Sequence, residues 1–345
     1  MLNYLMKRML IMIPTLLGIT FVTFLVMKLA PGDPVSLKLM FAGDNISPQA
    51  LASELSKQTS PLDLPAWYPK DNKAAKWVGE NTLFYLKWLK NITKLDFGLS
   101  LKDKRPVMGR IKEALPITLA LNLITIAIVY FISVPLGIWS ALNKDSVLDK
   151  IVMIKLFILY SLPTFWVATL LLVFFAGGEY LNWFPLMGYE SEMADSLPWW
   201  RWIGDVVWHL FLPIVASVYG SFAFLSRFAR SNFLEVVRQD FIRTARAKGL
   251  SESRVIFKHA LRNAMIPFIT LMGTLLPALL GGSVIIEKIF SIPGMGLLSF
   301  DAVLGRDYNV IMGIATIDAF LTLISLLVSD VLYVWVDPRI TFEGK

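Results

Sequence analysis

The stretch "ALPITLALNLITIAIVYFISVPLGIWSALN", Ala114–Asn143, contains no charged residue over 30 positions. About 20 apolar residues are enough for a helix to cross the hydrocarbon core of a bilayer. The whole chain of 345 residues is 56% hydrophobic and only 17% charged, whereas soluble domains carry about 25% charged residues. Its mean hydropathy is +0.60. The sequence therefore predicts an all-α polytopic membrane protein.

Five further runs of the same kind extend this prediction to six transmembrane helices. They are Met9–Met27, Leu156–Gly178, Val206–Ser226, Asn263–Ile286 and Tyr308–Val336, the last of which is interrupted by Asp318 and Asp330. A signal peptide is the alternative for the first run, but its apolar core would have only about 7–15 residues. Prolines, each able to kink a helix, lie inside most runs: Pro14, Pro135, Pro163, Pro213, Pro267 and Pro277.

The charges of the short loops predict the orientation of the spans, because Lys and Arg accumulate on the cytoplasmic side. Residues 227–262 carry nine Lys and Arg against three acidic residues, whereas residues 179–205 carry one Arg against five. The basic loop is therefore expected inside, with both termini. Residues 31–113 hold thirteen basic and nine acidic residues. A segment of this length crosses the membrane largely regardless of charge, so we expect an ordered extracytoplasmic insertion after the first helix.

Several kinds of chemistry are excluded by missing motifs. The chain has no G-x-x-x-x-G-K-[ST] loop to hold ATP phosphates and no cysteine. The two histidines, His209 and His259, fall on opposite sides of the membrane in this topology, which argues against a shared metal site. Asp318 and Asp330 are twelve residues apart on one helix, roughly 18 Å at 1.5 Å per residue, too far for a catalytic pair. The net charge of +7 is attributed to topology and not to nucleic acid, since the cations are not interleaved with aromatics.

The stretch "DFIRTARAKGL", Asp240–Leu250, is cationic in an otherwise apolar chain. Leu234, Val237, Phe241 and Ala245 are spaced for one face of a helix. Gly249 suits the position after a helix end, where positive φ is needed. Ser251 is then placed to cap a second helix. The stretch is predicted to form a helix, a glycine turn and a helix.

Two interpretations of this loop remain at this point. A topology signal without a partner explains the charge alone. The small residues Thr244, Ala245 and Gly249 favour a second interpretation, in which another protein approaches the backbone closely.

The segment "RTARAKG", followed by "HALRNAMIP", resembles the cytoplasmic loop of type I ABC importer permeases. The pattern of that family is E-A-A, three residues, G, nine residues, I-x-L-P. Gly249 and Leu261 match it, and Arg243, Thr244 and Ala245 stand at the E-A-A positions. Departures occur at Arg243 and, further on, at His259 and Arg262, which stand for Ile and Pro. A first Arg is usual in the oligopeptide/dipeptide/nickel branch, which commonly reads R-T-A-R-A-K-G.

The resemblance to this branch covers almost the whole chain. It includes "LAPGDP" from Leu29, "DFGLSL" from Asp96, "SLPTFWVATLLL" from Ser161, "FSIPGMGLL" from Phe290 and "VDPRI" from Val336. Asn309, after "GRDY", stands where Pro is usual. The stretches "FFAGGEYLNWFPLMG" and "DPRITFEGK" resemble the Yej-type peptide permeases, which also import peptide–nucleotide antibiotics of the microcin C kind.

The resemblance implies the type I ABC importer permease fold and a subunit that is not itself an enzyme. It implies ATP-driven import of peptides across the bacterial inner membrane by alternating access. The implied partners are a second homologous permease, cytoplasmic ABC ATPase subunits that bind ATP and Mg, an extracytoplasmic substrate-binding protein and lipid, but no nucleic acid. This chain itself would bind no cofactor.

The resemblance also divides the chain and assigns its sites. Residues 1–111 would form the first helix and the insertion, 112–337 the transmembrane domain with the coupling loop 227–262, and 338–345 a cytoplasmic tail. The ATPase-coupling residues would be Asp240, Phe241, Arg243, Thr244, Ala245, Arg246, Lys248, Gly249 and Leu250.

Asp318 lies in the middle of its span, where a carboxylate is costly, so it should face the bundle interior. It is a candidate for the substrate path together with Asn122, although a structural bond between Asp318 and Asn122 or a hydroxyl is the alternative. Two other classes of function remain: a proton-coupled secondary transporter using Asp318, and a constitutive channel. Import of nickel chelates or oligosaccharides is the alternative to peptides.

Overall fold

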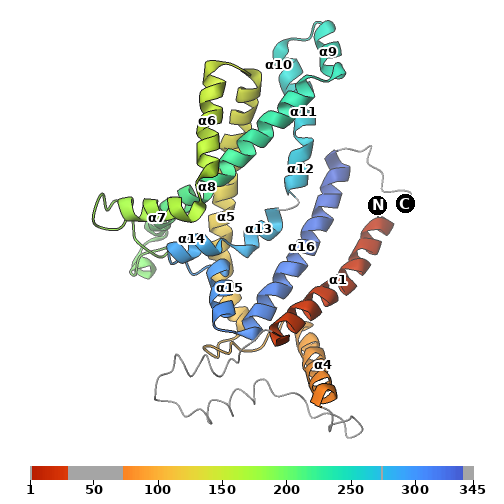
Figure 1. Ribbon diagram of the computed structural model, residues 1–345, viewed down its shortest axis with the longest axis vertical. Helices are drawn as coiled ribbons and strands as arrows, with labels where there is room; N and C mark the ends of the chain where they lie inside the picture. Colours follow the sequence, from red (N-terminus) through yellow and green to blue (C-terminus); the bar gives the residue numbers. More distant parts are fainter. Residues whose placement is uncertain (1, 30–72, 273–274, 337–345) are drawn as a thin grey trace. The chain divides into compact units, whose positions relative to one another are not determined.

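The computed structural model describes residues 2–29, 73–272 and 275–336 (Figure 1). Within these ranges the secondary structure is helical, apart from one isolated β-bridge between Leu99 and Pro106. The chain divides into two compact parts. The first is Met1–Ala114 with Leu298–Leu321, and the second is Leu115–Leu297 with Thr322–Lys345. Helices α5 (Val107–Leu142), α15 (Met295–Leu304) and α16 (Tyr308–Val336) contribute residues to both.

In the first part, α1 (Leu2–Leu29) packs against α4 (Lys73–Ile92). Phe24 of α1 contacts Tyr85 of α4, with ring centroids 5.4 Å apart, and the hydroxyls of Thr20 and Tyr85 are hydrogen-bonded at 2.9 Å. The expected insertion therefore contains an ordered helix, α4, which packs through its aromatic side. Residues 30–72 of the expected insertion lie outside the described residues.

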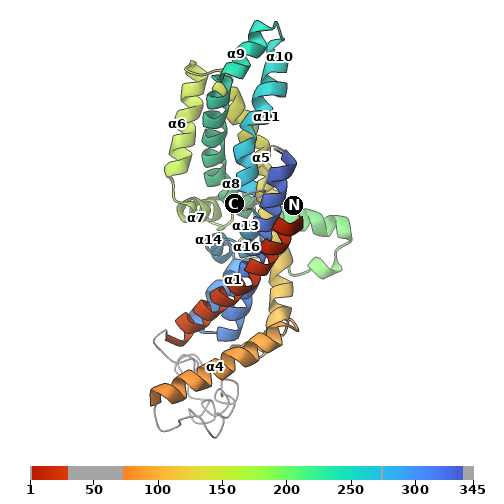
Figure 2. The same cartoon turned by 90° about the vertical axis from the view of Figure 1, so that its right-hand side faces the viewer.

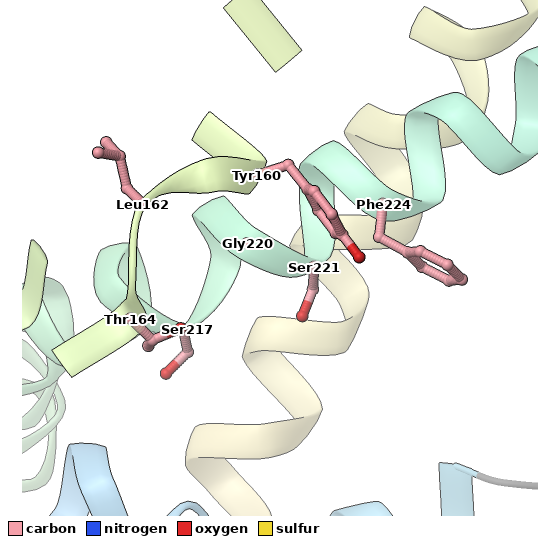
Figure 3. Close-up of a pocket in the computed structure, with 7 residues that line it drawn as sticks. All are labelled: Tyr160, Leu162, Thr164, Ser217, Gly220, Ser221 and Phe224. Carbon is pink, nitrogen blue, oxygen red and sulfur yellow. The ribbon is translucent and has the colours of Figure 1, made fainter. Parts of the chain in front are cut away.

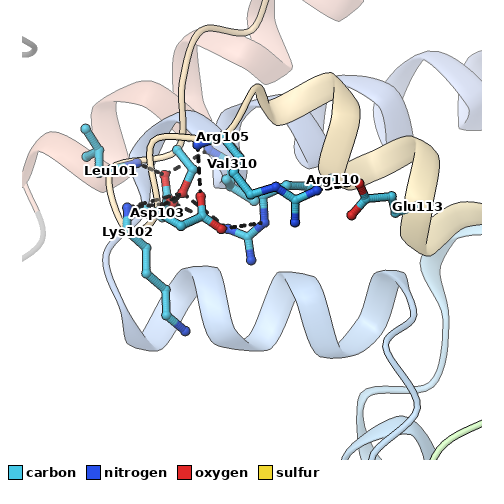
Figure 4. Close-up of polar contacts among 9 residues, drawn as sticks. Leu101, Lys102, Asp103, Arg105, Arg110, Glu113 and Val310 are labelled. Atoms are coloured by element: carbon cyan, nitrogen blue, oxygen red, sulfur yellow. Dashed lines mark hydrogen bonds and ion pairs between the residues drawn. The ribbon is translucent and has the colours of Figure 1, made fainter. Parts of the chain in front are cut away.

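A buried carboxylate organises the loop between α4 and α5 (Figure 4). Asp307 is 1% exposed and accepts hydrogen bonds from the Ser100 hydroxyl and, at 3.0 Å, from the Leu101 amide. Arg110 lies beside it, with Nη1 3.8 Å from an Asp307 oxygen and Nε 3.6 Å from Asp103. The "DFGLSL" loop is thus hydrogen-bonded to the residue before α16. Asp307 belongs to "GRDY", so these two motifs are in contact in the fold.

The second part contains a span that bends sharply. Helix α6 (Val147–Ser161) and helix α7 (Thr164–Phe175) meet at 91°, so that α7 runs across the direction of α6 (Figure 1). Pro163 disfavours the helical conformation of the residue before it, and Leu162 is extended at φ −83° and ψ 130°. The predicted run over residues 156–178 therefore starts too late, since α6 begins at Val147, and the kink that Pro163 indicated is a bend of 91°.

Helix α8 (Trp199–Val237) is continuous through Pro213. It is followed by α9 (Asp240–Ala247), α10 (Glu252–Arg254), the π-helix η3 (Val255–Ala260) and α11 (Leu261–Ala264). The other elements of this part are η2 (Ala194–Ser196), α12 (Ile266–Met272), α13 (Leu275–Gly281) and α14 (Val284–Ile289).

Among the described residues, four helices are long and apolar enough to cross a membrane, or five if the bent pair counts as one span. The expected span over residues 263–286 is divided among α11, α12, α13 and the start of α14, with residues 273–274 outside the described ranges. Pro267 and Pro277, each without a backbone N–H, lie in α12 and α13. The expected count of six spans is therefore not confirmed.

Helices α5 and α8 are in close contact near the cytoplasmic end expected for them. A Cβ added at Gly137 would lie 2.5 Å from Cβ of Ala229, so only glycine fits there. Nearby, Asp149 is 2% exposed, and its Oδ2 lies 2.8 Å from Nη2 of Arg230 in α8. The hydroxyl of Ser140 in α5 also donates a hydrogen bond to this carboxylate. The ends of α5, α6 and α8 are thus joined by one buried ion pair.

A second buried carboxylate holds the "IPGMG" turn. Glu287, which is fully buried, accepts hydrogen bonds from the Thr118 hydroxyl at 3.0 Å and the Leu297 amide at 2.8 Å. The Thr118 oxygen in turn accepts the Met295 amide at 2.8 Å. A Cβ at Gly294 would lie 2.5 Å from that oxygen, which accounts for a glycine in this motif.

Candidate coupling surface

Helix α9 lies beyond the end of α8, at one tip of the second part, and both views show it there beside α10 (Figures 1 and 2). Helices α8 and α9 are separate because Gln239, between them, is extended at φ −73° and ψ 154°. One continuous helical face from Leu234 to Ala245 is therefore a wrong prediction. The break changes the phase of the helix, so that Ile242 is fully buried whereas Phe241 is 39% exposed.

The glycine turn after α9 forms as predicted. Gly249 has φ +75°, a conformation that a residue with a Cβ adopts at a cost. The Leu250 amide donates to the Ala245 carbonyl at 3.4 Å and the Gly249 amide to the Arg246 carbonyl at 2.9 Å. This pair of bonds is a Schellman motif. Ser251 stands at the N-cap position of α10, although its side chain forms no capping hydrogen bond there.

An apolar cluster, which we call the loop core, fixes this loop to the membrane helices. It joins Ile242 and Ala245 of α9 to Phe233 of α8 and Ala141 of α5, and it is completed by Val236, Val255, Ala260 and Ala264. Leu250, at the residue after the glycine, packs against the same cluster. Because protein interiors are close-packed and resist deformation, a displacement of α9 has to move the ends of α8 and α5 with it.

The loop core also separates the expected coupling residues into two groups. Ala245 is 6% exposed and, like Leu250, packs against its own chain. Neither therefore offers the small outward face that the sequence suggested. The exposed members are Asp240, Phe241, Arg243, Thr244, Arg246, Lys248 and Gly249. A further apolar residue, Phe257 of η3, is 66% exposed. Sequence reasoning missed it because the π-helix shifts its helical phase.

Two of the outward cations are paired within the loop. The Arg246 guanidinium donates two hydrogen bonds to Glu252, at 2.6 and 3.1 Å, across the glycine turn. These hydrogen bonds lower the pKa of the Glu252 carboxyl and raise the pKa of Arg246. Burial shifts each pKa in the opposite direction, but by less. Arg243 lies 3.4 Å from Asp240 within α9. Arg246 therefore stiffens the turn, and Lys248 is the more available cation.

The two candidates for a substrate path are not alike in the structure. The Asn122 amide donates to the carbonyls of Ala278 and Leu279, both at 3.0 Å, which supports a structural role in holding α13 against α5. Asp318 is half-buried in α16 and belongs to the first compact part. Its role in a substrate path stays a prediction.

Two family profiles match the chain. Residues 133–342 match the family described as "Binding-protein-dependent transport system inner membrane component", and residues 1–122 match the N-terminal region of such membrane components. The chain belongs to this family. It is therefore a membrane component of a binding-protein-dependent transport system, as its resemblance implied. This family does not favour the proton-coupled alternative.

Two relatives are similar in sequence to this chain over nearly its full length. The inner membrane ABC transporter permease protein YejB of Escherichia coli O157:H7 is 36% identical, with 99% of each chain covered. The oligopeptide transport system permease protein AppB of Bacillus subtilis (strain 168) is 39% identical, with 98% of this chain and 99% of that protein covered.

A solved structure supports the fold. A chain from the inward-facing MetNI methionine ABC transporter superposes with a TM-score of 0.51 at 16% identity, covering 66% of this chain and 97% of that one. The likeness concerns the fold alone. It places the helical arrangement of this chain among ABC importer permeases.

Proposed function

We propose that this chain is a permease subunit of an ATP-driven importer that moves peptides across the cytoplasmic membrane by alternating access. The observation that carries the proposal is the loop core. Through it, α9 packs against the ends of α5 and α8, while the charged residues of α9 face outward. A helix placed in this way is able to transmit the movement of a partner to the membrane spans. The peptide class is supported by the names of the relatives, which include the dipeptide permease DppB of Alkalihalophilus pseudofirmus at 36% identity.

The partners in this proposal are a second permease subunit, cytoplasmic ABC ATPase subunits and an extracytoplasmic substrate-binding protein. ATP and Mg bind to the ATPase subunits, because this chain has no phosphate-binding loop. Closure of the ATPase dimer moves α9, and the rigid packing of the loop core makes α8 and α5 rock as one body. The exposed residues of α9, with Lys248, Gly249 and Phe257, form the docking face.

The proposed topology has six spans, with residues 31–113 outside and residues 227–262 and both termini inside the cytoplasm of a bacterium. The loop charges support this orientation. The fifth span would consist of the short helices α11, α12 and α13, which lie in sequence between the coupling loop and the "IPGMG" turn. The domain boundaries at residues 111 and 337 belong to the same proposal.

Cross-linking in the assembled complex tests the docking face, and the cysteine-free chain makes single cysteines specific. Thr244→Cys, exposed on α9, should form a cross-link with an ATPase subunit that carries a cysteine in its docking groove. Ser161→Cys, exposed at the end of α6, is the control and should not. A complex that co-purifies intact without any cross-link from Thr244→Cys would show that α9 is not the docking helix.

A further inference from the structure

An open hollow of about 530 Å³ lies where α6 and α7 meet against the middle of α8. Tyr160 and Thr164 line it from the two sides of the break, and Ser217, Ser221 and Phe224 line it from α8. Figure 3 shows the ring of Tyr160 reaching across α8 toward Ser221 and Phe224, whereas the side chain of Leu162 points the other way. The hollow is distinct from the coupling surface, which lies at the end of α8.

Hydroxyl groups dominate the polar lining of the hollow. Ser217 donates a hydrogen bond to the Pro213 carbonyl at 2.8 Å, within its own helix. Among the residues that the structure describes, the hydroxyls of Tyr160, Thr164 and Ser221 have no hydrogen-bond partner. Each hydroxyl both donates and accepts. The hollow therefore presents unused donors and acceptors without a carboxylate, an ammonium or a guanidinium in its lining.

The break in the span is an independent feature of the same place. The Tyr219 hydroxyl donates to the Leu162 carbonyl at 2.8 Å, which ties the extended residue to α8. At the break, Pro163 has no amide hydrogen, and the Leu162 carbonyl accepts from the Tyr219 side chain instead of from a following amide of a continuous helix. Interrupted spans of this kind form the substrate sites of many transporters, because unwound backbone offers polar groups inside the membrane.

The hollow lies toward the cytoplasmic side of the expected spans, because the guanidinium of Arg227, the first residue of the loop expected inside, is 5.7 Å from the centroid of the Tyr160 ring. Tyr160 and Thr164 lie near the centre of the 147–175 pair, and Ser217 and Ser221 lie near the centre of α8. Exposed backbone breaks and unpaired hydroxyls are not tolerated against lipid tails, but they are tolerated where they line a water-filled path. An open hollow of this kind therefore faces either such a path or a neighbouring subunit.

We propose that this hollow is a binding station for the main chain of the imported peptide, an inference that rests on the proposed function. A peptide unit carries one N–H donor and one C=O acceptor, and a cluster of uncharged hydroxyls pairs with both. The rings of Tyr160 and Phe224 provide apolar walls for side chains of any sequence. Recognition through the main chain accepts peptides of differing side chains, which a charged pocket would discriminate.

The test removes the three unused hydroxyls while keeping the shapes of their side chains. The variant Tyr160→Phe/Thr164→Val/Ser221→Ala is compared with Tyr180→Phe/Thr169→Val/Ser161→Ala, which removes the same groups from exposed positions that do not line the hollow. Uptake of a tripeptide and of its backbone N-methylated analogue is measured with the complete complex in proteoliposomes, together with the amount of each variant in the assembled complex.

For wild type and the control variant we expect tripeptide uptake with a clear preference over the N-methylated analogue. In the hollow variant the apparent KM for the tripeptide should rise at least about tenfold, because up to three hydrogen bonds to the peptide main chain are lost, and the preference over the analogue should disappear. An unchanged KM and an unchanged preference would overturn the site. Failure of the wild-type complex to import any peptide would instead overturn the proposed function.

A photo-reactive residue in place of Ser221 gives an independent test of what occupies the hollow. During uptake, a biotinylated tripeptide should be cross-linked, and excess unlabelled peptide should abolish the product. Cross-linking only to the second permease subunit, with no peptide product, would mean that the hollow is a subunit contact and would overturn the proposal.

Discussion

Gly249 is the residue on which the geometry of the coupling surface depends most. A Cβ there would meet no heavy atom of this chain within 4 Å, but φ is +75°. The effect of Gly249→Val is therefore backbone strain, about 1–2 kcal/mol, concentrated in the turn that joins α9 to α10. We expect normal insertion into the membrane and loss of substrate-stimulated ATP hydrolysis in the assembled complex.

Lys248→Ala is the matched control for Gly249→Val, because it removes an exposed charge and leaves the turn unstrained. Lys248 belongs to the docking face, but one screened surface charge contributes under about 1 kcal/mol, so stimulated hydrolysis should fall much less than in Gly249→Val. Membrane abundance and hydrolysis are measured for both. If Gly249→Val couples normally at wild-type abundance, the loop is only a topology signal.

The Arg246–Glu252 pair predicts a pH dependence confined to the turn. The hydrogen bond from Arg246 lowers the pKa of the Glu252 carboxyl, so its stabilisation is present above the unfolded pKa, about 4.3, and is lost as pH falls through the folded value. Hydrogen exchange of the α9 amides, corrected for the intrinsic rate, should show full protection from pH 7 to 5 and weaker protection below about pH 4. Glu252→Gln should abolish this change; the same change in that variant would rule the pair out.

At the scale of elements, the Asp149–Arg230 ion pair holds the ends of α5, α6 and α8 together. Asp149→Asn leaves Arg230, 18% exposed, without its counter-charge, and breaking a buried pair costs about 3–5 kcal/mol. We expect a marked loss of thermal stability in detergent and lower membrane abundance. Lys144→Ala, which removes an exposed pair with Asp145 at 3.4 Å, should change little. Equal stability of both variants would show that the buried pair is dispensable.

The elements also show what sequence reasoning can reach. Gly249 was predicted because a Schellman turn is set by local backbone geometry. The face that α9 buries was not predicted, because the extended Gln239 interrupts the helix and changes its rotation, so that Ile242 points inward. Pro163 indicated a kink, but its 91° size depends on packing against α8. The hollow could not be predicted from the sequence, because Tyr160 and Ser221, which both line it, are distant along the chain.

At the scale of the whole molecule, the loop charges predict which side of the membrane each loop occupies. The contacts within the chain do not determine this orientation. Lys76→Cys, exposed on α4, should react with an impermeant thiol reagent in intact spheroplasts, and Glu252→Cys should react only after the membrane is opened. The cysteine-free background makes wild type the blank. The reverse pattern of labelling would invert the orientation and would move α9 away from any cytoplasmic ATPase.

The central claim is that movement of a partner ATPase, transmitted through α9, drives import. The measurement that tests it most directly is tripeptide uptake into proteoliposomes containing the full complex and the binding protein, with ATP or with a proton gradient as the only energy source. We predict uptake with ATP, loss of that uptake in Gly249→Val, and no uptake with the gradient alone. Uptake that follows the proton gradient, persists without the ATPase subunits and is abolished by Asp318→Asn would contradict the account.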